Sequence, residues 1–209
     1  MEHLLVADSS SRGILVLAHG AGAGMRHAFL ERLAQALAAR KVATFRYEFV
    51  YMEKGGGRPD PPAVAAARVR EAVAAAADAA PGLPLFAGGK SFGGRMTSTA
   101  AADAPLPGVL GLVFLGFPLH PPGQPGIGRA EHLDRVTVPM LFLQGTRDTF
   151  AQLPLLEPVI ARLDPRATLH LIDGGDHSFK VPKRSGRTPE DVLNDLADTI
   201  AEWVEAAVA

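Results

Sequence analysis

Residues 83–93 read LPLFAGGKSFG, an apolar run followed by a serine between glycines and then by a helical pattern. We expect residues 83–87 to form a buried strand and residues 91–103 to form the helix after it. The G-x-S-x-G pattern in this strand–turn–helix context predicts a nucleophile elbow, with Ser91 at its tip. The two glycines that flank the serine allow a sharp backbone turn without clashes at Cβ.

The same alternation of apolar runs and helical patterns extends in both directions from this turn. The other expected strands are residues 13–18, 41–47, 108–115, 140–143 and 167–172, with residues 4–7 as a further edge strand. The other expected helices are residues 26–40 and 61–80, residues 153–163, and one that begins at the Thr188-Pro189-Glu190-Asp191 cap. Several runs are apolar on both faces, as in strands buried within a parallel sheet. The pattern predicts an α/β fold with one mostly parallel sheet of about six to seven strands and helices on both faces.

Two stretches are irregular by composition, residues 48–60 and residues 116–138, and both are rich in Gly or Pro. Each follows an expected strand, so both should lie at the carboxyl edge of the sheet, where open α/β sheets bind ligands. The helix after the first stretch should have Asp60 as its N-cap and Pro61 at its first position. The second stretch is too short and too rich in proline for a substantial cap domain. We therefore expect an open, shallow site.

The composition excludes several classes of function. The chain has 209 residues, which we take as one domain over residues 1–209. Lys+Arg 21 against Asp+Glu 22 gives a net charge of -1, with no basic excess for nucleic acid or an anionic membrane. Cysteine is absent, which excludes disulfides, thiolate metal sites and a cysteine nucleophile. No apolar run is long enough for a membrane span, and the first residues do not form a signal peptide, so we expect a cytoplasmic protein.

A serine hydroxyl becomes a strong nucleophile only when a base removes its proton, and that base needs a third group to orient it. After a nucleophile elbow, the acid and then the histidine follow along the chain. Asp148 follows the expected strand at residues 140–143, and His177 follows the last expected strand. We therefore predict Ser91, Asp148 and His177 as the catalytic residues, with Asp173 as the alternative acid.

The first buried strand is followed by the glycine-rich sequence HGAGAG at residues 19–24. Such a turn allows backbone amides to point into the site. We predict that the amides of Ala21 and Phe92 form an oxyanion hole, with Phe92 at the start of a helix. His19 is interpreted as a brace for this loop rather than as a group that transfers protons.

Further residues are candidates from their position at the same edge of the sheet. Gly22, Tyr51 and His120 lie in the turn and loops after strands, and we predict them as substrate-binding residues. Lys90 precedes the nucleophile, and we expect it to point aside and brace a neighbouring loop.

Nucleotide-binding motifs fit the chain less well. Gly89-Lys90-Ser91 resembles the end of a P-loop, but Pro84 stands where the first glycine is required. Residues 20–25 nearly match the dinucleotide fingerprint, with Glu48 as a possible ribose-binding acid, but Met25 replaces the third small residue. A dinucleotide enzyme also leaves the predicted triad unexplained. The histidines are scattered without an H-E-x-x-H motif, so we expect neither a metal nor a cofactor.

Five segments in this order resemble the small α/β-hydrolases related to dienelactone hydrolase, over about residues 12–206. They are HGAGAG (19–24), GGKSFGGR (88–95), GFPLHPPG (116–123), QGTRD (144–148) and GGDHSF (174–179). More narrowly, they are similar to compact bacterial predicted hydrolases that have distant eukaryotic relatives in a histone acetyltransferase complex. The resemblance implies Ser91 as the nucleophile, Asp148 as the acid and His177 as the base. It also implies that the amides of Ala21 and Phe92 are the oxyanion donors and that residues 118–120 have a substrate-side role. Dienelactone hydrolases use a cysteine nucleophile, so the resemblance does not imply their specificity.

The sequence therefore predicts a serine hydrolase of the carboxylesterase or thioesterase type. Its substrate would be a small-molecule ester or thioester with a short acyl group, or with an acyl group on a large carrier. The main alternative is a non-catalytic interaction module on the same fold, as in some of the eukaryotic relatives. An acyltransferase or peptidase with the same triad would differ only in its substrate. The oligomeric state is left open.

Overall fold

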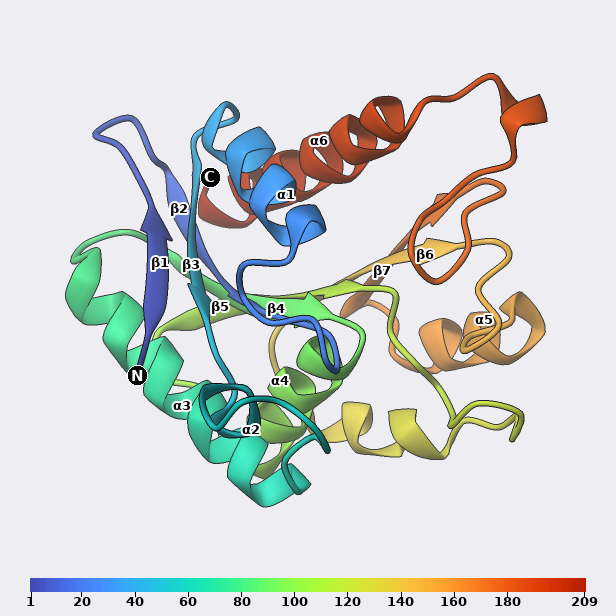
Figure 1. Ribbon diagram of the computed structural model, residues 1–209, viewed down its shortest axis with the longest axis horizontal. Helices are drawn as coiled ribbons and strands as arrows, with labels where there is room; N and C mark the ends of the chain where they lie inside the picture. Colours follow the sequence, from blue (N-terminus) through green and yellow to red (C-terminus); the bar gives the residue numbers. More distant parts are fainter.

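The computed structural model describes residues 1–209 and is built on a seven-stranded sheet in the order β1-β3-β2-β4-β5-β6-β7 (Figure 1). Only β1 is antiparallel to its neighbour β3, and every other neighbouring pair is parallel. The strands are β1 (His3–Val6), β2 (Gly13–Ala18), β3 (Val42–Tyr47), β4 (Leu85–Lys90), β5 (Val109–Leu115), β6 (Met140–Gly145) and β7 (Ala167–Ile172). The predicted α/β class and the mostly parallel sheet are confirmed.

Helices cover both faces of the sheet (Figure 1). They are α1 (Ala28–Ala38), α2 (Val50–Glu53), α3 (Pro62–Ala79), α4 (Phe92–Asp103), α5 (Leu153–Arg162) and α6 (Pro189–Val208), with 3₁₀ helices η1 (Gly128–Arg135) and η2 (Lys183–Ser185). A cluster of 19 buried apolar residues joins the sheet to α1 and α6. A larger cluster of 36 joins the other face to α3, α4 and α5. Two separate cores thus hold the sheet rigid between helical layers.

The last helix begins as predicted, with a reciprocal capping box. The Thr188 hydroxyl accepts from the amide of Asp191, and the Asp191 carboxylate accepts from the amide of Thr188. The apolar stripe of α6 is buried against the sheet and α1, and it contains Val192, Leu193, Leu196, Ala197, Ile200 and Val204. This cap fixes where the first turn of α6 lies at the carboxyl edge of the sheet.

Residues 48–60 are more ordered than predicted, because the short helix α2 forms within them. The proposed cap of α3 is wrong: Asp60 accepts a hydrogen bond from the amide of Tyr51 at 3.1 Å instead. Pro61 is the N-cap, and Pro62 takes the first helical position. The carboxylate therefore stabilises the start of α2 rather than the start of α3.

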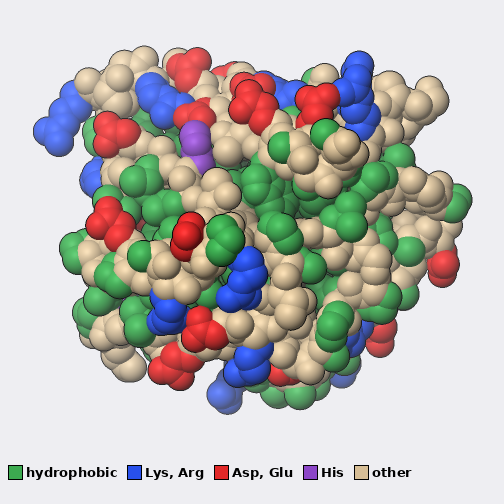
Figure 2. Space-filling model, turned by 180° about the vertical axis from the view of Figure 1, so that it is seen from behind, with side chains coloured by type: hydrophobic (Ala, Val, Ile, Leu, Met, Phe, Trp, Pro, Cys, Tyr) green, Lys and Arg blue, Asp and Glu red, His purple; other side chains and the backbone are tan.

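Residues 116–138 form no cap over the carboxyl edge. Their helix η1 packs against α4, on the face of the sheet away from α1 and α6. No helix of the protein is long and apolar enough to cross a membrane. On the face shown in Figure 2, acidic and basic side chains are interspersed, in keeping with the net charge of -1.

Candidate active site

Ser91 occupies a strained turn between β4 and α4. Its φ of 49° and ψ of -111° are rare for a residue with a side chain, and such strain is typical of functional positions. The turn is also tightly packed, because a Cβ on Gly93 would lie 2.6 Å from the carbonyl oxygen of His19. A Cβ on Gly89 would lie 2.3 Å from the carbonyl oxygen of Ala18. Glycines are therefore needed for β2 and the elbow to approach each other.

The structure brings Ser91, His177 and Asp148 together from three separate loops. The Ser91 Oγ lies 2.8 Å from His177 Nε2, and His177 Nδ1 lies 2.7 Å from Asp148 Oδ2. With the proton on Nδ1, the ring donates a hydrogen bond to the carboxylate, and its Nε2 accepts a hydrogen bond from the serine hydroxyl. The three side chains form one continuous hydrogen-bonded line.

Asp148 is held rigidly as the third member of this line. Its side chain has no solvent exposure. Its Oδ1 accepts from the amide of Phe150 at 2.8 Å, and its Oδ2 accepts from Gln144 Nε2 at 2.5 Å. Asp173, the alternative acid, is exposed and contacts only the hydroxyl of Thr146. The geometry therefore favours Asp148 over Asp173.

Two backbone amides near Ser91 are free to bind an anionic oxygen. The amide of Phe92 is at the N-terminus of α4, where the helix offers it no acceptor. The amide of Ala21 lies in the turn after β2, and neither amide donates to any group of the protein. Free backbone donors next to the nucleophile are one requirement of an oxyanion hole.

The glycine-rich turn is braced from beneath by α2 and the segment before it. The buried His19 ring contacts the carbonyl of Gly20 through Nδ1 and accepts from the amide of Phe49 through Nε2. Burial lowers the pKa of His19, which favours this neutral, bracing form. The amide of Gly22 donates to the Tyr51 hydroxyl at 2.8 Å. His19 thus acts as the predicted brace, and Tyr51 is a second one.

Lys90 braces the opposite wall of the site, as predicted. Its Nζ donates to the carbonyl oxygen of His177 at 2.5 Å and lies 5.3 Å from the centre of the Phe179 ring. Burial lowers the pKa of Lys90 to about 8. The hydrogen bond from Lys90 connects the loop that carries His177 to the end of β4.

A cavity of about 720 Å³ opens at Ser91 and runs between α1 and α6. Its lining residues are Gly20, Ala21, Ala23, His27, Ala28, Phe29, Arg32, Lys90, Ser91, His177, Ser178, Phe179, Lys180, Val181, Arg187, Pro189, Val192, Leu193 and Leu196. Exposed residues such as Ala28 and Lys180 form its mouth, so the site is open as expected. Its lining also includes the buried Leu193 and Leu196 of α6.

Gly22, Tyr51 and His120, which the sequence suggested as substrate-binding residues, do not line this cavity. The amide of Gly22 and the hydroxyl of Tyr51 are bonded to each other. His120 is only 2% exposed, and its ring contacts Gln152 and the carbonyl of Pro121. All three are used to hold loops in place.

Sequence reasoning missed the residues that form the apolar wall of the cavity. Phe29 of α1 and Val192, Leu193 and Leu196 of α6 belong to helical stripes that the sequence presents as core. One signal in the sequence could have indicated these residues. Helix α1 begins directly after the glycine-rich turn, and α6 begins directly after the loop that carries His177.

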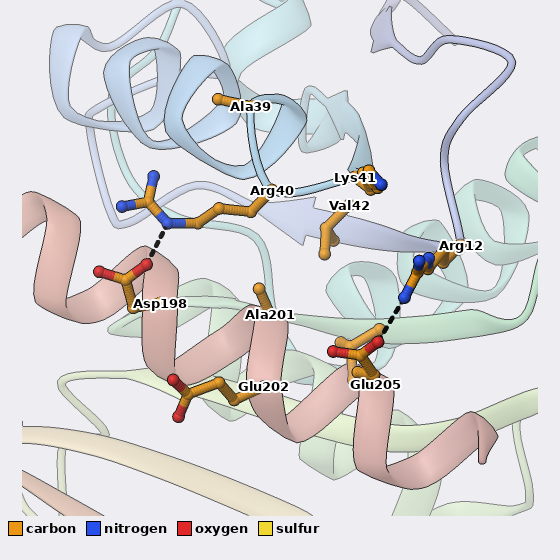
Figure 3. A pocket seen from close by; sticks show the side chains of 10 residues that line it. Arg12, Ala39, Arg40, Lys41, Val42, Asp198, Ala201, Glu202 and Glu205 are labelled. Atoms are coloured by element: carbon orange, nitrogen blue, oxygen red, sulfur yellow. Dashed lines mark hydrogen bonds and ion pairs between the residues drawn. The ribbon is translucent and has the colours of Figure 1, made fainter.

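A smaller cavity of about 300 Å³ lies at the other end of α1 and α6 (Figure 3). Ion pairs between Arg40 and Asp198 and between Arg12 and Glu205 cross it. Because its lining contains no histidine and no serine, it has no group of residues that resembles a serine hydrolase site.

A second serine–histidine contact lies between α4 and η1. Ser98 Oγ is 2.7 Å from His132 Nε2, but Ser98 is fully buried and its hydroxyl also bonds to the carbonyl of Arg95. Burial lowers the pKa of His132 to about 4. A substrate has no access to this serine, so the contact is structural.

The model of a known family, described as an alpha/beta hydrolase domain, matches residues 11–205. The chain therefore belongs to the α/β-hydrolase family, as the motifs around Ser91 and His177 predicted.

Solved structures of hydrolases share this fold. A dienelactone hydrolase from Anabaena variabilis ATCC 29413 is 22% identical, covers 98% of this chain and 90% of its own, and superposes with a TM-score of 0.74. Est1E from Butyrivibrio proteoclasticus with bound ferulic acid is 16% identical, with 96% and 94% covered and a TM-score of 0.71. A monoacylglycerol lipase from Paleococcus ferrophilus is 16% identical, with 99% and 100% covered and a TM-score of 0.71. At these identities the likeness establishes the fold.

Proposed function

We propose that the protein is a serine hydrolase that transfers the acyl group of an ester or thioester to water. The observation that carries the proposal is the line of hydrogen bonds from Ser91 through His177 to Asp148, next to two free amides. The family match and the esterase and lipase among the similar structures support a hydrolase.

In the proposed mechanism, Ser91 Oγ attacks the carbonyl carbon while His177 Nε2 takes the hydroxyl proton. Asp148 holds the ring in the correct tautomer and stabilises its positive charge. The amides of Ala21 and Phe92 bind the oxyanion of the tetrahedral intermediate. His177 then protonates the leaving group, and an acyl-enzyme remains on Ser91. The same ring removes a proton from water, which attacks the acyl-enzyme and releases the acid.

The proposal is tested by labelling with a fluorophosphonate probe together with hydrolysis of p-nitrophenyl esters. We expect wild type to be labelled, and we expect Ser91→Ala and His177→Ala not to be. Hydrolysis by Ser91→Ala should fall by about a thousandfold or more, because the triad acts as a unit. Ser98→Ala is the matched control, since it removes the other serine that contacts a histidine, and it should be labelled like wild type.

Two outcomes contradict the proposal. One is full esterase activity of Ser91→Ala. The other is a folded wild type that neither reacts with the probe nor hydrolyses any ester or thioester. The second outcome favours the alternative, a non-catalytic interaction module on a hydrolase fold.

A further inference from the structure

We propose that the cavity between α1 and α6 binds a linear apolar chain of the substrate, so that the preferred esters carry a chain of medium length. This inference rests on the proposed function and specifies the substrate class for the same site. The sequence alone predicted short acyl groups in a shallow site.

The position of the cavity makes it part of the reaction site. Ser91, His177 and the oxyanion turn at Ala21 form one end, so a molecule bound there has its carbonyl beside the nucleophile. The lining also includes Leu193 and Leu196 on the buried face of α6. A chain attached to the reacting carbonyl can therefore lie against this lining.

Nine of the nineteen lining residues are hydrophobic. Phe29 of α1 stacks with Phe179, which lies in the loop that carries His177, and the two ring centres are 6.0 Å apart. Val192 and Leu193 of α6 line the same cavity. None of the lining side chains is a carboxylate, and the cationic Arg32 and Arg187 are each paired with an acid outside the lining. The apolar side chains offer contacts to methylene groups, and polar residues such as His27, Ser178 and Lys180 make up the rest of the lining.

Phe179 shows that this wall is built at a conformational cost. Its φ is 62°, which is unfavourable for a bulky residue, and the surrounding structure has to maintain it. The strained backbone places the ring between Phe29 and the ammonium of Lys90, two residues after the base. The same loop thus carries the general base and one wall of the proposed binding site for the apolar chain of the substrate.

The volume sets the length of the chain. A group the size of a water molecule takes up about 30 Å³, so about 720 Å³ holds roughly 24 non-hydrogen atoms. After the ester group and the open mouth are subtracted, roughly six to ten carbons remain for a linear chain. Acetate would leave most of this volume unfilled.

The experiment measures kcat/KM for two series of substrates below their critical micelle concentrations. In p-nitrophenyl esters from acetate to dodecanoate the acyl chain varies, and in n-alkyl acetates the alcohol chain varies. We expect kcat/KM in one series to rise about threefold to fourfold per methylene up to the optimum, and to fall beyond it. The series that responds identifies which side of the ester occupies the cavity.

Ala28→Trp tests the location. Ala28 is exposed at the mouth of the cavity, so the larger side chain fills space without disturbing the core. In the responding series, the ratio of kcat/KM for the eight-carbon chain to that for the two-carbon chain should fall at least tenfold. Ala63→Trp is the matched control, because Ala63 is equally exposed in the first turn of α3 and lies outside the cavity. This control should keep the wild-type ratio.

Flat profiles in both series overturn the inference, and so does an Ala28→Trp variant with the wild-type chain-length ratio. If Ser91 still reacts with fluorophosphonate in those cases, the proposed hydrolase function stands and only the chain site is wrong. Absence of both labelling and hydrolysis overturns the function and this inference together.

Discussion

Tyr51 shows how a single side chain can serve the site without touching substrate. Its hydroxyl accepts from the amide of Gly22, the residue after the predicted oxyanion donor Ala21. Burial raises the pKa of Tyr51, so the hydroxyl keeps its proton. An oxyanion hole depends on fixed donors, and this bond fixes the backbone on one side of the donor.

Tyr51→Phe should therefore lower kcat by about threefold to tenfold, the value of one ordinary hydrogen bond, with little change in KM. Steady-state kinetics on a p-nitrophenyl ester measure both constants. Tyr47→Phe is the control, because Tyr47 is buried nearby and its hydroxyl has no hydrogen-bond partner. Equal effects of the two substitutions, or an unchanged kcat for Tyr51→Phe, would show that the Gly22 bond does not position the donor.

At the scale of elements, the site depends on how closely β2 and the start of α4 approach each other. Backbone atoms of Ala18 and His19 lie where a side chain on Gly93 would be. This approach sets the distance between the amides of Ala21 and Phe92, the two predicted oxyanion donors. The close approach of β2 and α4 depends on how the two elements pack together, and neither helix propensity nor strand propensity specifies it.

Gly93→Ala should destabilise the protein by about 1–3 kcal/mol through overpacking and should also reduce esterase activity. Gly128→Ala is the control, since a Cβ there meets nothing within 4 Å, and it should change the free energy of unfolding by less than about 0.5 kcal/mol. Urea unfolding followed by circular dichroism measures both free energies. A Gly93→Ala protein with wild-type stability would mean that β2 and α4 can separate freely.

At the scale of the whole molecule, η1 is tied to α4 through a histidine that stays neutral. Burial lowers the pKa of His132 to about 4, with Arg135 and Arg95 acting in the same direction. In the unfolded chain the same ring takes up a proton near pH 6.5. Between these values the unfolded state binds more protons, so this group lowers stability as the pH falls from about 6.5 toward 4.

His132→Gln should remove that contribution. The free energy of unfolding of wild type should fall relative to that of the variant as the pH is lowered through this window, by at most about 1.4 kcal/mol per pH unit. Denaturant unfolding at several pH values between 4 and 7 measures the difference. Parallel stability profiles for the two proteins would show that His132 is not held neutral.

The sequence by itself determined the order of strands and helices, the elbow at Ser91 and the loops that carry Asp148 and His177. These features depend on local rules: apolar runs form strands, glycines permit sharp turns, and parallel strands bring the loops at their carboxyl ends to one edge. Ser91 and its two hydrogen-bonding partners could therefore be predicted before any distance was known.

Only the tertiary structure decided which way the remaining side chains face. Tyr51 and His120 lie on loops at the correct edge, but contacts with residues far away in the chain turn them toward Gly22 and Gln152. Phe29 and Leu193 have the periodicity of core residues, yet both line the cavity that opens at Ser91. A helical stripe specifies that a face is apolar, whereas the packing of neighbouring elements decides whether protein atoms or a ligand cover it.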